Sequence, residues 1–391
     1  MEDNAKNEKR GFLFVAAILL VGMNLRAPVT CIGAISDMLC EQLQLSGAAA
    51  GLLTTLPLLS FAVFATVSGR LGSFFGLGRS LCLSMLLVVI GVAVRSLCGT
   101  AGLFFGTVLA GLGIGVANVL IPVVIKAYYP ERIGTMTGAY TTSMSILAGL
   151  ASAICVPMAE SSLGWRGALG VWLIPALLAF LLWIPRRSLR MPQTDGSRSA
   201  SHVLRSRVAW YCTLYMGTQA FVYYGFISWM PSILASRGMD ASSAGYLISV
   251  YQLMGIPANF IAPLLAGKLR DQRILTGGVS ALYLGGILLL LFARSKALLW
   301  TSVILCGFCT GCAFALCMAL IGIRTRSAGD AAGLSGLLQT VGYAIAAVGP
   351  FLLGRIFDAV GSWDLPLICL TVIVALNAVC GQLAGKEGYV S

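Results

Sequence analysis

Arg26 is the residue of this chain whose position points most clearly to chemistry. It lies inside a long apolar run, 11–35, so its charge is expected deep within a hydrophobic helix. An arginine at the centre of a membrane costs about 2.5–3.5 kcal/mol on insertion scales, and it therefore faces protein or a water-filled cavity. The sequence offers its guanidinium no carboxylate within an apolar run. An anionic solute is a candidate partner, since the guanidinium is a planar fork of donors. Backbone carbonyls and side-chain amides are the alternative.

Other polar side chains recur at helical spacing within apolar runs. Gly22 and Gly33 share a helix face with Arg26, and their small size is expected to leave a cavity beside it. Each polar residue could contact a solute or form a hydrogen bond between helices, and both interpretations stay open. The candidate solute-binding residues are Arg26, Thr30, Asn118, Gln219, Tyr223, Gln252, Gln339 and Tyr343.

Other residue patterns do not predict a catalytic or metal site. His202 is the one histidine and lies in a polar segment, so no catalytic set with histidine fits the apolar runs. The cysteines of 306–317 resemble an iron–sulfur spacing, but the last gap is one residue too long and the run is apolar. The glycines of 111–115 lack the preceding strand of a phosphate-binding loop and predict helix packing. We therefore expect no enzyme, no cofactor and no metal.

The composition predicts a helical membrane protein. Hydrophobic residues make up 58% of the 391-residue chain and charged residues 10%, with a mean hydropathy of +0.90. A soluble domain carries about 25% charged residues, because its surface faces water. A membrane span needs about 20 mostly apolar residues. Twelve windows meet this need: 11–35, 47–69, 79–98, 101–127, 134–158, 164–185, 208–231, 243–266, 274–293, 297–322, 333–356 and 364–384.

The basic residues predict the orientation of the chain in the cell membrane. With twelve spans both termini lie on one side, and most of the 26 Lys and Arg residues fall in the loops of that side, Arg324 among them. Few fall on the other side, which includes Arg95. Because loops rich in Lys and Arg stay in the cytoplasm, both termini are predicted to be cytoplasmic. The same distribution explains the net charge of +12 without a nucleic-acid partner.

The chain is predicted to consist of two similar six-helix halves. Gly111 and Gly115 of the fourth window recur as Gly307 and Gly311 of the tenth. The segment 186–207, rich in Arg, Ser and Gly, separates the halves and is typical of a flexible linker. We therefore expect an N-terminal half at 1–185, a cytoplasmic basic linker at 186–207 and a C-terminal half at 208–391.

Two loops carry a family resemblance. The segment Gly69–Arg79 resembles the loop signature of the major facilitator superfamily, although Ser73 stands where the acid is expected, and Gly267–Arg273 resembles it with the acid present. In that superfamily the fold has twelve helices in two halves, and the solute binds between the halves near the membrane midplane. The resemblance implies a gating role for these loops. The candidate gating residues are Arg70, Arg79, Arg270, Asp271 and Arg273.

A narrower resemblance lies in the first window. Asn24-Leu25-Arg26-Ala27-Pro28 is similar to the Asn-x-Arg-Pro element of the cyanate permease family, which includes nitroimidazole porters, although Ala27 separates the arginine from the proline. It implies a monomeric transporter that moves a small anion or a small planar polar solute by alternating access. A proton-coupled drug-efflux antiporter of the same superfamily is the alternative. A membrane receptor or enzyme without transport would need intramembrane titratable groups or an added domain.

Overall fold

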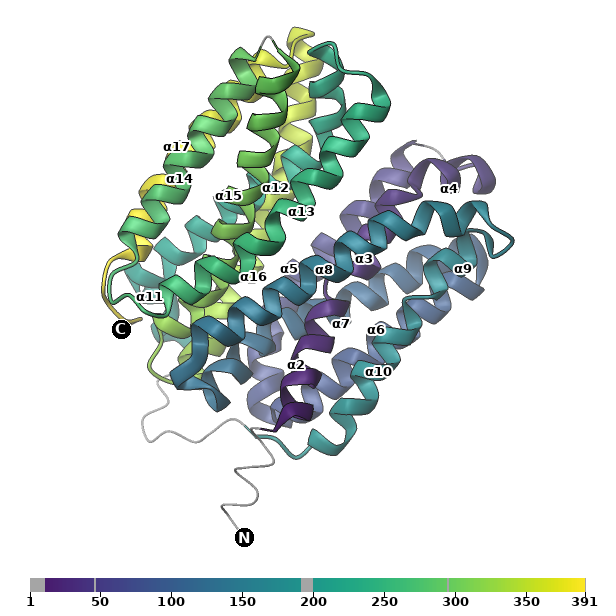
Figure 1. Cartoon of the computed structure of the whole chain (residues 1–391). Helices are drawn as coiled ribbons and strands as arrows, with labels where there is room; N and C mark the ends of the chain where they lie inside the picture. Colours follow the sequence, from purple (N-terminus) through teal and green to yellow (C-terminus); the bar gives the residue numbers. More distant parts are fainter. Residues whose placement is uncertain (1–10, 46, 191–199, 294, 391) are drawn as a thin grey trace. The chain divides into compact units, whose positions relative to one another are not determined.

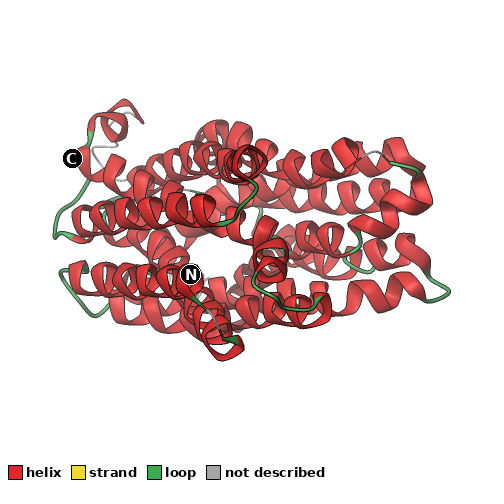
Figure 2. Cartoon of the chain, turned by 90° about the horizontal axis from the view of Figure 1, so that it is seen from above, coloured by secondary structure: helices red, strands yellow, loops and turns green. Residues whose placement is uncertain are grey.

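The computed structural model describes residues 11–45, 47–190, 200–293 and 295–390. These residues form helices joined by short turns, and none of them is in a strand (Figure 2). The helices of the first part of the chain are α2 Phe12–Asn24, α3 Ala27–Ala34, α4 Ser36–Leu43, α5 Gly47–Phe75, α6 Leu77–Leu97, α7 Gly99–Tyr128, α8 Ile133–Glu160, α9 Gly164–Gly170 and α10 Leu173–Trp183. The later helices are α11 Ala200–Arg205, α12 Arg207–Ser236, α13 Ala241–Ala266, α14 Arg273–Phe292, α15 Lys296–Ile323, α16 Ala328–Val360 and α17 Asp364–Gly385.

The predicted all-α membrane fold is confirmed. Ten helical stretches of the described residues are long and apolar enough to cross a membrane; α2 with α3 and α9 with α10 each form one of them. The remaining two predicted spans correspond to α5 and α12, with 29 and 30 residues. Within the described residues, the ten stretches together with α5 and α12 correspond to the twelve predicted spans. Figure 1 shows α2, α3 and α4 as successive separate pieces of helix.

Close contacts divide the chain into two units, which are described one at a time. Unit 1 comprises residues 1–131, 139–198 and 327–340, and unit 2 comprises 132–138, 199–326 and 341–391. Within the predicted linker, residues 191–199 lie outside the described residues, and Ala200–Arg205 forms the short helix α11. The boundaries predicted for the two halves and the linker stay a prediction.

The second span is longer than predicted. We expected a loop from 70 to 78, but α5 continues as helix to Phe75. The chain turns at Gly76, whose φ of 87° lies in the left-handed region that favours glycine. Gly78 follows at the start of α6, where a Cβ would lie 2.0 Å from the carbonyl oxygen of Arg186. The two glycines therefore serve as a tight turn packed on the end of α10, which leaves little loop between α5 and α6.

The repeated glycines pack equivalent helices in the two units. In unit 1, a Cβ on Gly111 would lie 2.9 Å from Cβ of Ser60 on α5. In unit 2, a Cβ on Gly307 would lie 2.4 Å from the carbonyl oxygen of Tyr251 on α13, and one on Gly311 would lie 2.7 Å from Cα of Gly255. Close approach of backbones through small residues is the usual packing of membrane helices. The prediction of helix packing for these glycines is confirmed.

The cysteines of α15 lie in the interior of unit 2. Cys306 and Cys309 are fully buried, and Cys312 and Cys317 are nearly so. These cysteines are therefore small side chains of the core.

Candidate functional site

The first membrane span is interrupted at Arg26. Helix α2 ends at Asn24, and α3 begins at Ala27 with Pro28 in its first turn. Proline has no N–H and clashes with the preceding turn, so a continuous helix is disfavoured at this point. Arg26 caps α3 with φ −122° and ψ −41°, outside the helical region. The span therefore consists of two pieces of helix that meet at a charged residue.

Two side chains hold the interrupted span in place. The amide of Asn24 donates to the carbonyl oxygen of Leu20 at 2.7 Å and to that of Pro175 on α10 at 3.0 Å. Arg95 of α6 donates through Nη1 to the carbonyl oxygen of Pro28 at 2.5 Å. One piece of the span is thus anchored to α10 and the other to α6.

Arg95 is a buried residue, which corrects the sequence analysis. We had placed it among the charges of an external loop, but it is 1% exposed and lies in the last turn of α6. Its Nη2 also contacts Sγ of Cys31 at 3.4 Å. In the sequence, the burial of Arg95 is indicated by its position inside the predicted window 79–98. A guanidinium can be buried there because the carbonyl oxygen of Pro28, in the first turn of α3, accepts from it.

The surroundings of Arg26 differ in part from the prediction. Arg26 and Thr30 are both half-buried, and Thr30 Oγ1 lies 3.3 Å from the carbonyl oxygen of Arg26. A Cβ on Gly33 would meet nothing within 4 Å, as expected for an open side of the helix. Gly22 does not border a cavity, because a Cβ there would lie 2.8 Å from both Tyr140 and Ser143 of α8. The prediction of a cavity was therefore wrong at Gly22, which packs two helices together.

Asn118 and Gln339 lie in the interior of unit 1. They are 3% and 1% exposed. Next to Asn118, the carbonyl oxygen of Val119 accepts a hydrogen bond of 2.9 Å from Oγ of Ser335 on α16. Ser335 is fully buried and was missed by the sequence analysis. Ser335 thus connects α16 to α7 beside Asn118, and the side chains of Asn118 and Gln339 are not on an exposed surface.

Unit 2 brings four of the predicted residues near one another. The hydroxyl of Tyr223 on α12 donates to Oε1 of Gln252 on α13 at 3.3 Å. Gln219, one turn before Tyr223, donates to the carbonyl oxygen of Thr310 at 3.4 Å. Tyr343 of α16 lies within this part of unit 2, beside Tyr224 of α12. Gln252 is half-buried, whereas Gln219 is 2% exposed.

The predicted gating residues of unit 2 interact within their own loop. Asp271 accepts a hydrogen bond of 2.9 Å from Nε of Arg273 and forms an ion pair of 2.7 Å with its Nη2. These contacts hold the pKa of Asp271 below its usual value. Arg270 and Arg79 are exposed, and the side chain of Arg70 lies outside the described part of the structure. The gating role stays a prediction.

A second buried arginine, Arg324, connects several segments of unit 2 near the loop Gly267–Arg273. Arg324 is 2% exposed, and it donates to Oε1 of Gln272 and to the carbonyl oxygens of Ala384 (3.0 Å) and Gly385 (2.6 Å). Its own carbonyl oxygen accepts from the amide of Val390 at 2.8 Å. In the sequence, Arg324 is interpreted only as a charge that sets the topology. It links the loop before α14 to the end of α17 and to the C-terminal segment.

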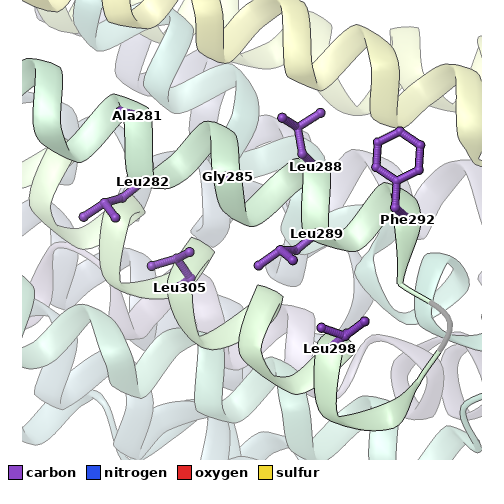
Figure 3. A pocket seen from close by; sticks show the side chains of 8 residues that line it. All are labelled: Ala281, Leu282, Gly285, Leu288, Leu289, Phe292, Leu298 and Leu305. Atoms are coloured by element: carbon purple, nitrogen blue, oxygen red, sulfur yellow. The ribbon is translucent and has the colours of Figure 1, made fainter.

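A cavity of about 450 Å³ lies between α14 and α15. Figure 3 shows that Leu282, Leu289 and Leu305 line it, and all eight lining residues lack a polar side chain. A site for a polar solute needs at least a few convergent polar groups. This cavity is therefore not the candidate solute site; its exposed leucines face the surroundings of the bundle, as expected for contact with lipid.

The arrangement of the helices indicates the class of protein to which the chain belongs. In the described residues, a bundle of membrane-length helices with polar side chains such as Asn118, Gln219 and Gln339 in its interior has the architecture of a secondary transporter. The Major Facilitator Superfamily model matches residues 12–347. The chain belongs to this family of transporters and is not an enzyme.

Relatives cover nearly the whole chain. It is 40% identical over 383 residues to the "Uncharacterized transporter YycB" of Bacillus subtilis, with 97% of this chain and 95% of the relative covered. It is 38% identical to the "2-nitroimidazole transporter" of Escherichia coli, with 97% of both chains covered. It is 24% identical to the "Cyanate transport protein CynX" of Escherichia coli, with 92% of this chain and 95% of the relative covered. The predicted family resemblance is confirmed.

Solved structures show the same fold. A structure of the proton:xylose symporter XylE bound to 6-bromo-6-deoxy-D-glucose superposes with a TM-score of 0.77 and covers 94% of both chains at 16% identity. At this identity the likeness concerns the fold alone.

Proposed function

We propose that this transporter moves a small anion or a small planar polar solute, of the cyanate or nitroimidazole kind, across the cell membrane. Support comes from the names of the two Escherichia coli relatives, which carry a linear anion and a planar nitro-substituted ring. The observation that carries the proposal is the half-buried Arg26 at the interruption of the first span. In this proposal Arg26 binds the solute through charge-assisted hydrogen bonds.

The local geometry favours a negative charge at this point. Arg26 stands at the N-terminal end of α3, where the peptide dipoles add a partial positive charge to that of the guanidinium. In transporters, the N-terminal ends of interrupted membrane helices commonly point at anionic groups of the solute. The anchors at Asn24 and Arg95 keep the two helix pieces fixed, so little reorganisation is needed when a solute binds.

We infer that transport proceeds by alternating access of two six-helix halves, in a monomer whose termini are both cytoplasmic. The duplicated glycine packing supports the two-half organisation, because α5 with α7 and α13 with α15 are built alike. The concentration of Lys and Arg on one side of the predicted topology supports the orientation. The loop Gly267–Arg273 is proposed to contribute to gating, with Asp271 paired to Arg273, the first residue of α14.

Direct binding to the purified transporter tests this function. Thermal unfolding is followed with cyanate, 2-nitroimidazole and a chemically unrelated neutral sugar at increasing concentrations. A ligand that binds only the folded state stabilises it by mass action and so raises the midpoint temperature. At a ligand concentration of one hundred times Kd, the free energy of unfolding rises by about 2.7 kcal/mol. We expect a shift with at least one of the first two solutes and none with the sugar. No shift with either, or an equal shift with the sugar, would refute the proposed solute class.

A further inference from the structure

Four tyrosines and one glutamine of unit 2 lie together where α12, α13 and α16 meet. This tyrosine–glutamine cluster consists of Tyr223, Tyr224, Tyr251, Gln252 and Tyr343. The ring of Tyr224 lies 4.9 Å from that of Tyr223 at 78° and 6.4 Å from that of Tyr343 at 61°. The rings of Tyr223 and Tyr251 are nearly parallel, 6.5 Å apart. At such distances and angles aromatic rings attract one another, and a further ring can join them.

One side of the cluster is occupied by a closed hydrogen-bond chain. The hydroxyls of Tyr251 and Thr310 are 2.9 Å apart, and Thr310 Oγ1 donates to the hydroxyl of Tyr283 at 2.7 Å. The carbonyl oxygen of Thr310 accepts from Gln219. Tyr251 and Tyr283 are 2% and 1% exposed. This side has a structural role, because its polar atoms bind one another in the core.

The other side of the cluster offers hydrogen-bond donors. Tyr224 and Gln252 are both half-buried. Since the hydroxyl of Tyr223 donates to Oε1 of Gln252, the amide is held in one orientation. Its Nε2 has two N–H donors and, within the described residues, no hydrogen-bond acceptor. A partly buried amide that is oriented by one neighbour and unused at its nitrogen is suited to bind an acceptor atom of a ligand.

Glycine contacts hold the helices that carry the cluster close together. Gly307 allows α15 to approach the backbone of α13 at Tyr251, where any side chain would collide with a carbonyl oxygen. Gly349 allows α16 to approach α12 in the same way, since a Cβ there would lie 2.8 Å from the carbonyl oxygen of Phe221. The backbones of the helices that carry the rings are thus held by direct contacts, and such preorganisation lowers the cost of binding a solute.

We propose that the tyrosine–glutamine cluster is a binding site for the flat ring of an aromatic or heteroaromatic solute that carries an oxygen acceptor, such as a nitro or carboxylate group. The ring packs against Tyr224 and Tyr343, and the acceptor oxygen receives the N–H of Gln252. The cluster selects ring solutes over small linear anions, which have no face for the tyrosines to contact. This inference rests on the proposed function and specifies which of its solute types the protein prefers.

Paired ligands and variants test the site. The affinities of purified transporter for 2-nitroimidazole and for cyanate are measured for the wild type, Tyr224→Leu, Tyr224→Phe and Gln252→Met. Methionine is similar in length to glutamine but has no N–H, so it removes the donor without adding a charge. Tyr246→Leu is the matched control, because Tyr246 also lies on α13 but is 63% exposed and packs on Trp300.

A ring contact is worth about two- to tenfold in affinity. We expect Tyr224→Leu and Gln252→Met to weaken 2-nitroimidazole binding by at least that factor, and cyanate binding by less than twofold. Tyr224→Phe and Tyr246→Leu should bind the ring like the wild type. Each unliganded variant is also unfolded thermally, which detects a purely structural role.

The outcomes separate this inference from the proposed function. If the wild type binds 2-nitroimidazole but Tyr224→Leu and Gln252→Met bind it equally well, the cluster site is refuted and the function stands. The site is also refuted if the variants lose both ligands in parallel with a loss of thermal stability. If the ring binds and depends on the cluster but not on Arg26, the site stands and the role of Arg26 fails. A wild type that binds neither solute refutes both.

Discussion

Replacing Arg95 with leucine should loosen the second piece of the first span. The guanidinium is buried and donates to the carbonyl oxygen of Pro28 at 2.5 Å and to Sγ of Cys31 at 3.4 Å. A hydrogen bond from a charged group contributes about 1.5–3 kcal/mol net, and one to sulfur contributes less. Removing the charge also removes the cost of burying it, which offsets part of the loss. We therefore expect a net destabilisation of about 2 kcal/mol.

Thermal unfolding of purified protein measures this effect. For a chain of this length, a loss of about 2 kcal/mol should lower the Tm by roughly 2 °C. Arg95→Lys should be at least as damaging, because it keeps a buried charge but has no planar fork to reach both acceptors. Arg166→Leu is the control, since Arg166 is exposed and lies over the ring of Trp165. A Tm of Arg95→Leu equal to that of this control would show that Arg95 does not hold α3.

Two further predictions concern helix packing and topology. Gly307→Ala places a Cβ 2.4 Å from a backbone oxygen of α13 and should cost about 1–3 kcal/mol in thermal unfolding. Gly278→Ala, with nothing within 4 Å of its Cβ, should cost nothing; equal Tm values for the two would contradict the packing role. A reporter fused after Ser391 should be cytoplasmic and one inserted in 36–46 external, and the opposite labelling would overturn the orientation.

The helices could be predicted from the sequence because hydropathy and span length are local properties. The repeated glycines were also interpretable, since Gly111 and Gly307 lie in equivalent windows and small residues at such spacing pack helices. The end of α5 was not predictable in the same way. Gly76 and Gly78 form a tight turn only because Arg186, distant in the sequence, supplies the backbone against which Gly78 packs.

The buried arginines mark the limit of prediction for the site. In the sequence, Arg95 and Arg324 look like ordinary charges at the ends of spans. Their burial depends on carbonyl oxygens of Pro28, Ala384 and Gly385, which reach them only in the folded chain. Arg26 could be identified because its distance from both ends of an apolar run is visible in the sequence. The pairing of Tyr223 with Gln252 was not, because it joins two helices.

The affinity of Arg26→Lys for the solute tests the central claim most directly. Binding of 2-nitroimidazole and cyanate is measured together with the Tm of the same Arg26→Lys and Arg26→Ala preparations. Loss of a charge-assisted hydrogen bond should weaken binding by about tenfold to a hundredfold in both variants, while their Tm stays near that of the wild type. Full binding by a stable Arg26→Ala protein would contradict the role of Arg26 in solute binding. A large fall in its Tm would instead assign Arg26 to holding the two pieces of the first span together.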